Sequence, residues 1–176
     1  MKSLNKNNKS AFSLLETIVV LFIVSVGLVS ILSLTVDSVR AQNLNKNSFV
    51  AYRLSLEGLE LIKNVRDSNF IQNTSSTPVA WNLGIEGTAT STKYKVDYVS
   101  TTPIIISGMS EARLRLDTDN FYLHNDIYPN SIFSRLITIT AGGTAASSTV
   151  SSLVEWLDQG QVYQVELTSI LYDWSY

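Results

Sequence analysis

The sequence predicts an α+β protein in which a long N-terminal helix, membrane-spanning in its first half, packs on a small C-terminal antiparallel β-sheet. Two observations predict this order of elements. Up to residue 67 the apolar residues follow helical spacing, and residues 17–36 carry no charge. After residue 67 the composition changes to Ser, Thr, Asn and Gly, and the apolar residues change towards the alternation typical of strands. With 176 residues, the chain has room for about one ordinary domain.

These patterns divide the chain into five segments. They are a basic leader at residues 1–11, a transmembrane helix at 12–36, an extracytoplasmic continuation of that helix at 37–67, a connecting loop rich in Ser, Thr and Asn at 68–92, and an antiparallel β domain at 93–176. The chain thus carries its most apolar part near the N-terminus and its predicted strands at the other end.

The uncharged stretch at residues 17–36 predicts the membrane-spanning segment. As a helix it would extend about 30 Å, which matches the hydrocarbon thickness of a bilayer. Three lysines precede the stretch, Lys2, Lys6 and Lys9, whereas Asp37 and Arg40 follow it. The positive-inside rule therefore places the N-terminus in the cytoplasm and the C-terminus outside. A cleaved secretory signal is the alternative, but its apolar region normally covers only about 7–15 residues.

The residues after the span continue the helical pattern. One apolar stripe, at spacings of three, four and seven residues, must be covered by another element. Its members are Leu44, Ala51, Leu54, Gly58, Leu61 and Val65. Gly58 costs about 1 kcal/mol relative to Ala in a helix, which indicates either a close approach to a neighbouring element or a tolerated surface glycine. The asparagine-rich residues 43–47 predict fraying or a bend.

Alternating apolar residues predict five strands in the C-terminal half. They are residues 94–99, 113–116, 133–140, 149–156 and 162–172. The sequence DQGQ between the last two predicts a tight turn, so these two strands are expected to form an antiparallel hairpin.

The composition excludes several classes of function. The chain has no Cys, which excludes disulfides, thiolate catalysis and zinc ribbons. The single histidine, His124, lies near Asp126 in a segment that predicts a surface loop. No nucleophile-elbow, metalloprotease or nucleotide-binding motif is present. We therefore expect no enzyme and no required cofactor.

Oxygen-bearing side chains cluster between residues 117 and 126. Asp117, Asp119, Asn120 and Asp126 offer the hard ligands that Ca²⁺ prefers in a loop. The segment lacks the glycine and the terminal glutamate of an EF-hand. A calcium loop of another type and a solvated turn, in which Asp and Asn are common, are the two interpretations.

Basic residues occur on several of the predicted strands. They are Lys93, Lys95, Arg113, Arg115 and Arg135. If their outward faces converged, they would form a patch for nucleic acid. The formal net charge of -2 and the interleaved acidic residues favour a mixed solvated surface instead. Nucleic acid is therefore the less favoured partner.

The junction AFSLLETIVVLFIVSVGLVSIL resembles the N-terminal processing motif of type IV pilins and pseudopilins. That motif has a short basic leader, a small residue, a Phe and an apolar stretch interrupted by one Glu, which correspond here to residues 2–10, Ala11, Phe12 and Glu16. The resemblance implies that a prepilin peptidase cuts between Ala11 and Phe12 and methylates the new amino terminus. The family usually has Gly before the cut and often a Pro within the apolar stretch, whereas this chain has Ala11 and only Gly27.

Glu16 is the one ionisable residue in the apolar stretch. A carboxylate there costs about 2.5–3.5 kcal/mol on an insertion scale, and such groups persist when they have a partner. Cleavage would create that partner, because the new amine of Phe12 lies one helical turn from Glu16. The amine belongs either to the same chain or, as the resemblance implies, to a neighbouring subunit. A Glu16 that reaches the headgroups is the alternative.

The expected function is structural. The resemblance implies a minor pilin-like or pseudopilin-like subunit of a type IV pilus or related secretion filament, with residues 12–36 in the filament core. Expected partners are the prepilin peptidase, other pilin or pseudopilin subunits, the inner-membrane assembly machinery and the lipid bilayer. The protein is expected first in the cytoplasmic membrane and then in an extracellular or periplasmic filament. The alternative is an uncleaved, single-span anchored extracytoplasmic β domain that binds a ligand or partner.

Overall fold

The computed structural model describes residues 13–88, 91–100, 102–142 and 146–174. Helix α1 covers Leu14–Gln72, and all the strands follow it. The chain divides between Leu44 and Asn45, within α1, into two units. The first unit contains the N-terminal part of α1, and the second contains the rest of α1 and the whole sheet. The α+β fold class is confirmed, with one long helix and an antiparallel sheet packed on it.

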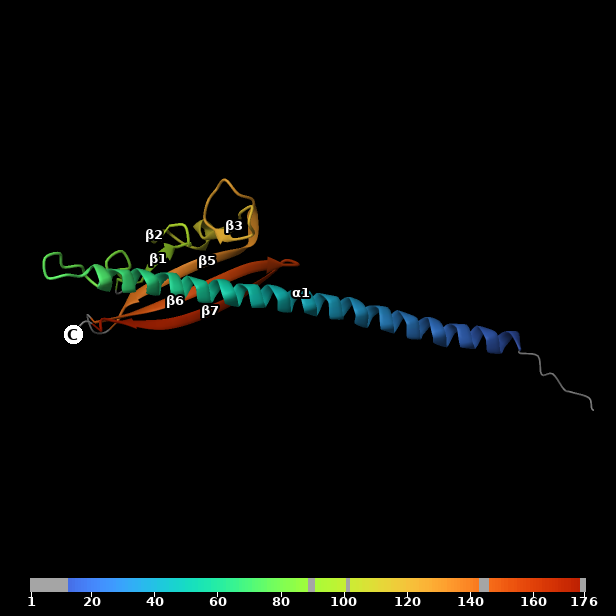
Figure 1. Cartoon of the computed structure of the whole chain (residues 1–176). Helices are drawn as coiled ribbons and strands as arrows, with labels where there is room; N and C mark the ends of the chain where they lie inside the picture. Colours follow the sequence, from blue (N-terminus) through green and yellow to red (C-terminus); the bar gives the residue numbers. More distant parts are fainter. Residues whose placement is uncertain (1–12, 89–90, 101, 143–145, 175–176) are drawn as a thin grey trace, which may run out of the picture. The chain divides into compact units, whose positions relative to one another are not determined.

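Seven strands form a single antiparallel sheet. They are β1 (Thr92–Lys95), β2 (Ile104–Ile105), β3 (Arg113–Leu116), β4 (Tyr122–Leu123), β5 (Asn130–Ala141), β6 (Ser147–Asp158) and β7 (Gln161–Tyr172), with a 3₁₀ turn η1 at Met109–Glu111. The three long strands β5, β6 and β7 lie side by side (Figure 1). Along its other edge, β5 pairs first with β3 and then with β1, and these carry β4 and β2 as outer neighbours.

The last two strands form the predicted hairpin. Asp158 pairs with Gln161, and the two residues between them have positive φ angles, 50° at Gln159 and 82° at Gly160. This conformation is that of a type I′ turn, whose twist matches that of the flanking strands. Burial along β6 alternates at every second residue from Ser148 to Trp156. The side chains therefore divide into one face towards α1 and one outer face.

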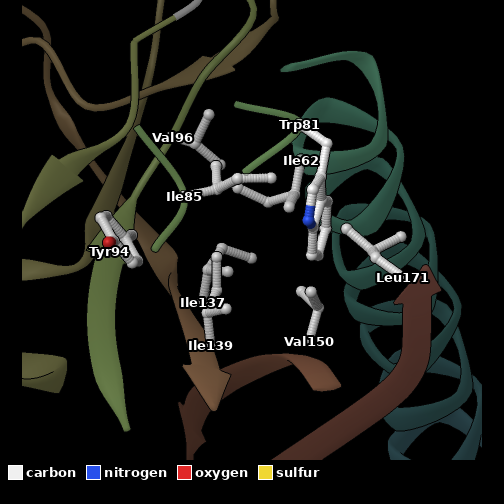
Figure 2. Packing of buried hydrophobic residues seen from close by; sticks show 9 residues of the cluster. All are labelled: Ile62, Trp81, Ile85, Tyr94, Val96, Ile137, Ile139, Val150 and Leu171. Atoms are coloured by element: carbon white, nitrogen blue, oxygen red, sulfur yellow. The ribbon is translucent and has the colours of Figure 1, made fainter. Parts of the chain in front are cut away.

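The second unit buries one face of α1 against the sheet. The buried residues of this helix are Ala51, Leu54, Ser55, Gly58, Ile62 and Asn69. Figure 2 shows Ile62 meeting Trp81 and Ile85 from the loop after α1, together with residues of β5 and β6, in the main hydrophobic core. The rest of that core consists of Tyr94, Val96, Ile137, Ile139, Val150 and Leu171. A smaller cluster of Ile106, Ala112 and Leu136 lies apart from it.

Gly58 lies at a close approach of the helix to the sheet. A Cβ atom built on Gly58 would lie 2.6 Å from Oγ of Ser152 and 2.8 Å from Cδ1 of Ile137. One turn earlier, the buried hydroxyl of Ser55 donates a hydrogen bond of 2.6 Å to the carbonyl oxygen of Ser152. Of the two interpretations of Gly58, the close approach is therefore the one that the structure supports.

The helix ends later than the sequence pattern predicts. It continues through residues 68–72, which were assigned to the connecting loop. The reason is tertiary: Asn69 is buried, and its side-chain amide donates to the carbonyl oxygens of Trp81 at 3.0 Å and Leu83 at 2.9 Å. These bonds hold the polar loop against the helix, so this loop supplies Trp81 and Ile85 to the core. The asparagine-rich residues 43–47 do not interrupt α1.

The strand predictions differ from the structure mainly in the shorter strands. Strands β5 and β6 extend beyond the predicted ranges at both ends, and β7 begins one residue earlier than predicted. By contrast, β1 ends at Lys95, because the Asp97 carboxylate accepts hydrogen bonds from the backbone amides of Val99 and Ser100 and turns the chain. Strands β2 and β4 have two residues each, too short for alternation to reveal.

Substituting Gly58→Leu is expected to destabilise residues 45–176 by about 1–3 kcal/mol, because the added side chain meets the sheet at less than contact distance. Urea unfolding in detergent, followed by tryptophan fluorescence, measures this change. Gly108→Ala is the control, since nothing lies within 4 Å of a Cβ at Gly108. Equal stability of Gly58→Leu and Gly108→Ala would contradict the close approach.

Candidate functional site

The N-terminal part of α1 exposes its apolar side chains on every side. Every described residue from Ser13 to Asn43 is exposed. The exposed fraction of the large apolar side chains in this part ranges from 48% at Val19 to 79% at Leu14. A helix that is apolar all round is stable only when lipid or other helices cover it. This part of α1 therefore needs surroundings that the rest of the described chain does not supply.

Among the described residues, α1 is the one helix that is long and apolar enough to cross a membrane. The 18-residue stretch that meets this test lies near the N-terminus, and none of it is buried. In this respect it differs from the core helix of a soluble protein, which the protein itself covers. The composition and exposure of α1 thus agree with the membrane span predicted from the sequence.

Most of the hydroxyl side chains within the apolar stretch bond to the backbone of their own helix. The hydroxyls of Ser25, Ser30 and Thr35 donate to the carbonyl oxygens four residues earlier, at 2.7, 3.0 and 2.9 Å. These bonds satisfy the hydroxyl donors without water, which is required where lipid surrounds a helix. The serines and threonines therefore do not conflict with membrane insertion.

Glu16, by contrast, has no hydrogen-bond partner of this kind within the described helix. It lies in the first turn of α1, is exposed, and forms no ion pair with another described residue. Ala11 and Phe12, the predicted processing residues, lie outside the described residues. The structure thus places Glu16 at the N-terminal end of the apolar helix, where a helical residue four positions earlier would share its face.

Two of the four predicted calcium ligands, Asp117 and Asp126, make other contacts in the structure. Oδ1 of Asp117 accepts hydrogen bonds from the backbone amides of Asp119 and Phe121, and Oδ2 accepts one from the Tyr98 hydroxyl. Asp126 pairs instead with Arg115, at 2.8 Å. Among the described residues, no three acidic or histidine side chains are grouped so that they would hold a metal ion. The segment has the geometry of a turn organised by Asp117, and we propose no calcium site here.

The hydrogen bonds to Asp117 also shift two pKa values. The backbone amide of Phe121 is the main cause of the lowered pKa of Asp117. The bond from Tyr98 to this carboxylate raises the pKa of Tyr98 to about 12. Since both groups are held in their ordinary charge states, this pair acts as a structural contact.

The five basic residues do not share an exposed surface, because Arg135 is fully buried. Its side chain has 0% exposure and extends from β5 towards α1. The guanidinium donates to the carbonyl oxygens of Leu54 at 3.1 Å and Val96 at 2.7 Å, and it pairs with Glu57 at 3.1 Å. Arg135 thus joins α1, β5 and the segment after β1. The interpretation of Arg135 as part of a nucleic-acid patch is wrong.

His124 is also buried, contrary to the predicted surface loop. Its side chain is 4% exposed, and its backbone amide donates to the carboxylate of Asp97, 27 residues earlier. Nδ1 lies 3.8 Å from Oδ2 of Asp97, beyond hydrogen-bonding distance. Burial, reinforced by the positive charge of Arg135, lowers the pKa of His124 to about 4. Nothing in the sequence pattern distinguished this histidine, because a strand as short as β4 positions it.

Comparison with known proteins identifies one matching family model. Residues 6–32 match the prokaryotic N-terminal methylation motif, the signature of type IV pilins. The match covers Ala11, Phe12, Glu16 and most of the apolar stretch, and the predicted resemblance is therefore confirmed for this segment. No curated protein and no solved structure matches the chain. The sheet-bearing unit from Asn45 onwards thus lies outside the matched segment.

Substituting Arg135→Met is expected to lower the free energy of unfolding by about 1–3 kcal/mol for each carbonyl that loses its donor, those of Leu54 and Val96. Urea unfolding in detergent measures the loss. Arg113→Met on β3 is the matched control, because Arg113 is exposed and its substitution is expected to change stability by less than about 0.5 kcal/mol. A loss of equal size in both variants would show that burial of Arg135 is not the cause.

Stability is expected to fall as the pH drops from about 6.5 to about 4, because the unfolded chain protonates His124 in this range and the folded chain does not. Above pH 6.5 His124 is neutral in both states and costs no stability. Between pH 6.5 and pH 4 the free energy of unfolding is expected to fall by roughly 3 kcal/mol in total. Unfolding curves at a series of pH values for the native chain and for His124→Gln test this expectation. The difference between the two isolates His124 from the carboxylates, and parallel pH profiles would refute it.

Proposed function

We propose that the chain is a minor subunit of a type IV pilus or of a related secretion filament. The observation that carries this proposal is the methylation motif at residues 6–32, which coincides with an apolar helix that the described protein leaves uncovered. The motif implies a prepilin peptidase and neighbouring pilin subunits as partners. The function of pilin subunits is structural, and we propose a structural role for this chain.

In the proposed mechanism, the apolar helix first holds the subunit in the cytoplasmic membrane. The N-terminus faces the cytoplasm, in agreement with the three lysines before the span, and the sheet-bearing unit faces outward. The peptidase then removes residues 1–11 and methylates the amine of Phe12. After assembly, the apolar side chains that contact lipid in the membrane contact the helices of neighbouring subunits instead.

Glu16 selects the position of the subunit in this mechanism. Its carboxylate has no ion-pair partner among the described residues, and an unpaired charge in an apolar environment is costly. The amine of Phe12 from a neighbouring subunit would neutralise it. Removing either charge would leave the other unpaired, so the pair favours subunits that are both cleaved and correctly placed.

Processing is tested by intact mass and N-terminal sequencing of the membrane-extracted chain, from cells with and without an active prepilin peptidase. The expected product starts at N-methylated Phe12 only when the peptidase is present. A chain that keeps residues 1–11 in both cells would favour the anchored binding domain, and a start near Gln42 would indicate a secreted protein.

Assembly is tested by substituting Glu16→Ala. This change is expected to spare membrane insertion but to reduce incorporation into filaments by more than about tenfold, because the partner amine loses its counter-charge. Quantitative immunoblotting of sheared filaments against the membrane fraction measures the ratio. Asp37→Ala is the matched control, since Asp37 lies just after the apolar stretch in an exposed pair with Arg40 at 3.9 Å. Normal incorporation of Glu16→Ala would refute the pairing mechanism.

A further inference from the structure

A cavity of about 580 Å³ lies between the last turns of α1 and two loops of the sheet-bearing unit. One wall is helical and includes Asn64, Ser68 and Gln72, which follow each other at intervals of four residues and so share one face. The opposite walls come from the loop at residues 83–84 and from Val96, Tyr98, Thr102 and Pro103. The volume falls in the range of about 300–1,000 Å³ that is usual for small-ligand sites.

The cavity lining mixes apolar and polar side chains and carries no charged residue. None of the twelve lining residues is Asp, Glu, Lys, Arg or His. Its polar groups are amides and hydroxyls, from Asn64, Ser68, Gln72, Tyr98 and Thr102 among others. Such groups both donate and accept hydrogen bonds. An ionic ligand would find no counter-charge in this lining, so the chemistry favours a neutral ligand rich in hydroxyls or amides.

The helical wall carries side-chain amide groups that are available to hydrogen-bond a ligand. The Gln72 side chain forms no hydrogen bond with another described residue and is exposed. Ser68 donates to Oδ1 of Asn64 at 3.2 Å, which leaves the amide nitrogen of Asn64 as a free donor among the described residues. Asn69 is different, because its amide nitrogen is already bonded to the loop that carries Leu83. The loop wall is thus held in place by Asn69, while its neighbours on the helix face the opening.

The remaining walls are apolar and partly rigid. Leu83, Val96 and Pro103 supply aliphatic surface. Val96 belongs to the buried core shown in Figure 2, so this wall is held by packing. The Tyr98 ring is fixed by its hydroxyl bond to Asp117 and by a ring contact with Phe121 at 5.6 Å. The cavity therefore combines an apolar surface with a row of amides and hydroxyls.

We propose that this cavity binds one neutral sugar residue of a glycan. A pyranose ring has an apolar face of C–H groups and a rim of hydroxyls, which matches the aliphatic and aromatic walls on one side and the row Asn64, Ser68 and Gln72 on the other. Tyr98 accepts at its oxygen while its proton bonds to Asp117. The site is independent of filament assembly, so its failure would not affect the proposed function.

The test is titration of the full chain with methyl glycosides of glucose, galactose, mannose and N-acetylglucosamine, followed by saturation-transfer NMR. The detergent must be zwitterionic, because a sugar headgroup would compete. At least one glycoside is expected to bind saturably at about millimolar concentration, as its size allows. The uronic acid of the bound sugar is expected to bind at least about tenfold more weakly, since the lining offers no counter-charge.

Two variants locate the binding. Gln72→Leu removes the free amide and Ser68→Phe fills the cavity, and each is expected to weaken binding at least about fivefold. Gln164→Leu, on the exposed outer face of β7, is the matched control and is expected to bind as the native chain does. The proposal is overturned if none of the four glycosides binds saturably, if the uronic acid binds equally well, or if both variants bind like the control. Circular dichroism verifies that each variant is folded.

Discussion

The close approach of α1 to the sheet at Gly58 is the constraint on which the sheet-bearing unit depends. At this point the helix presents small side chains, and Ser55 bonds to the backbone of β6. The approach brings Leu54 and Glu57 within reach of Arg135, whose terminal guanidinium nitrogens then contact two carbonyl oxygens and one carboxylate. A larger residue at Gly58 would widen this spacing and leave those groups partly unpaired. The packing at Gly58 and the hydrogen bonds of Arg135 therefore depend on the same helix position. The bond from Arg135 to Val96 also holds the segment after β1.

The two parts of α1 differ in the surroundings that they require. From Asn45 onwards it buries one stripe of mostly small and aliphatic residues against the sheet, as a helix on a sheet does, and exposes a mixed face that carries both charged and aromatic side chains. Up to Val36 its large exposed side chains are apolar on every side, and the hydroxyls of Ser25, Ser30 and Thr35 bond to the backbone of the helix itself. The first part is thus suited to an environment of lipid or other helices, and the second to its own sheet. This difference is what makes the methylation motif at residues 6–32 physically consistent with the rest of the chain.

Prediction succeeded where the signal was local and repeated. The apolar stripe of α1 predicts which side of the helix is covered, and the structure buries Ala51, Leu54 and Gly58 fully and the other three members by half. The alternation along β6 predicts the buried face of that strand in the same way. Prediction failed where a partner distant in sequence decides. Asn69 continues the helix because Trp81 and Leu83 offer it carbonyl oxygens, and His124 is buried beside Asp97. Single charged residues were the least predictable, since a basic residue on a strand has the same sequence signature whether it faces water or the core.

The sequence by itself determined the class of the protein: an apolar N-terminal helix with one acidic residue, a processing motif before it, and a β region after it. These features are local, and each is written in consecutive residues. Only the tertiary structure decided that Gly58 marks a contact, that Arg135 is an internal bridge, and that Asp117 organises a turn. It also decided that the helix and two loops enclose a neutral cavity. The physical reason is that burial and hydrogen bonding of a side chain depend on what packs against it, and its neighbours in sequence do not specify that.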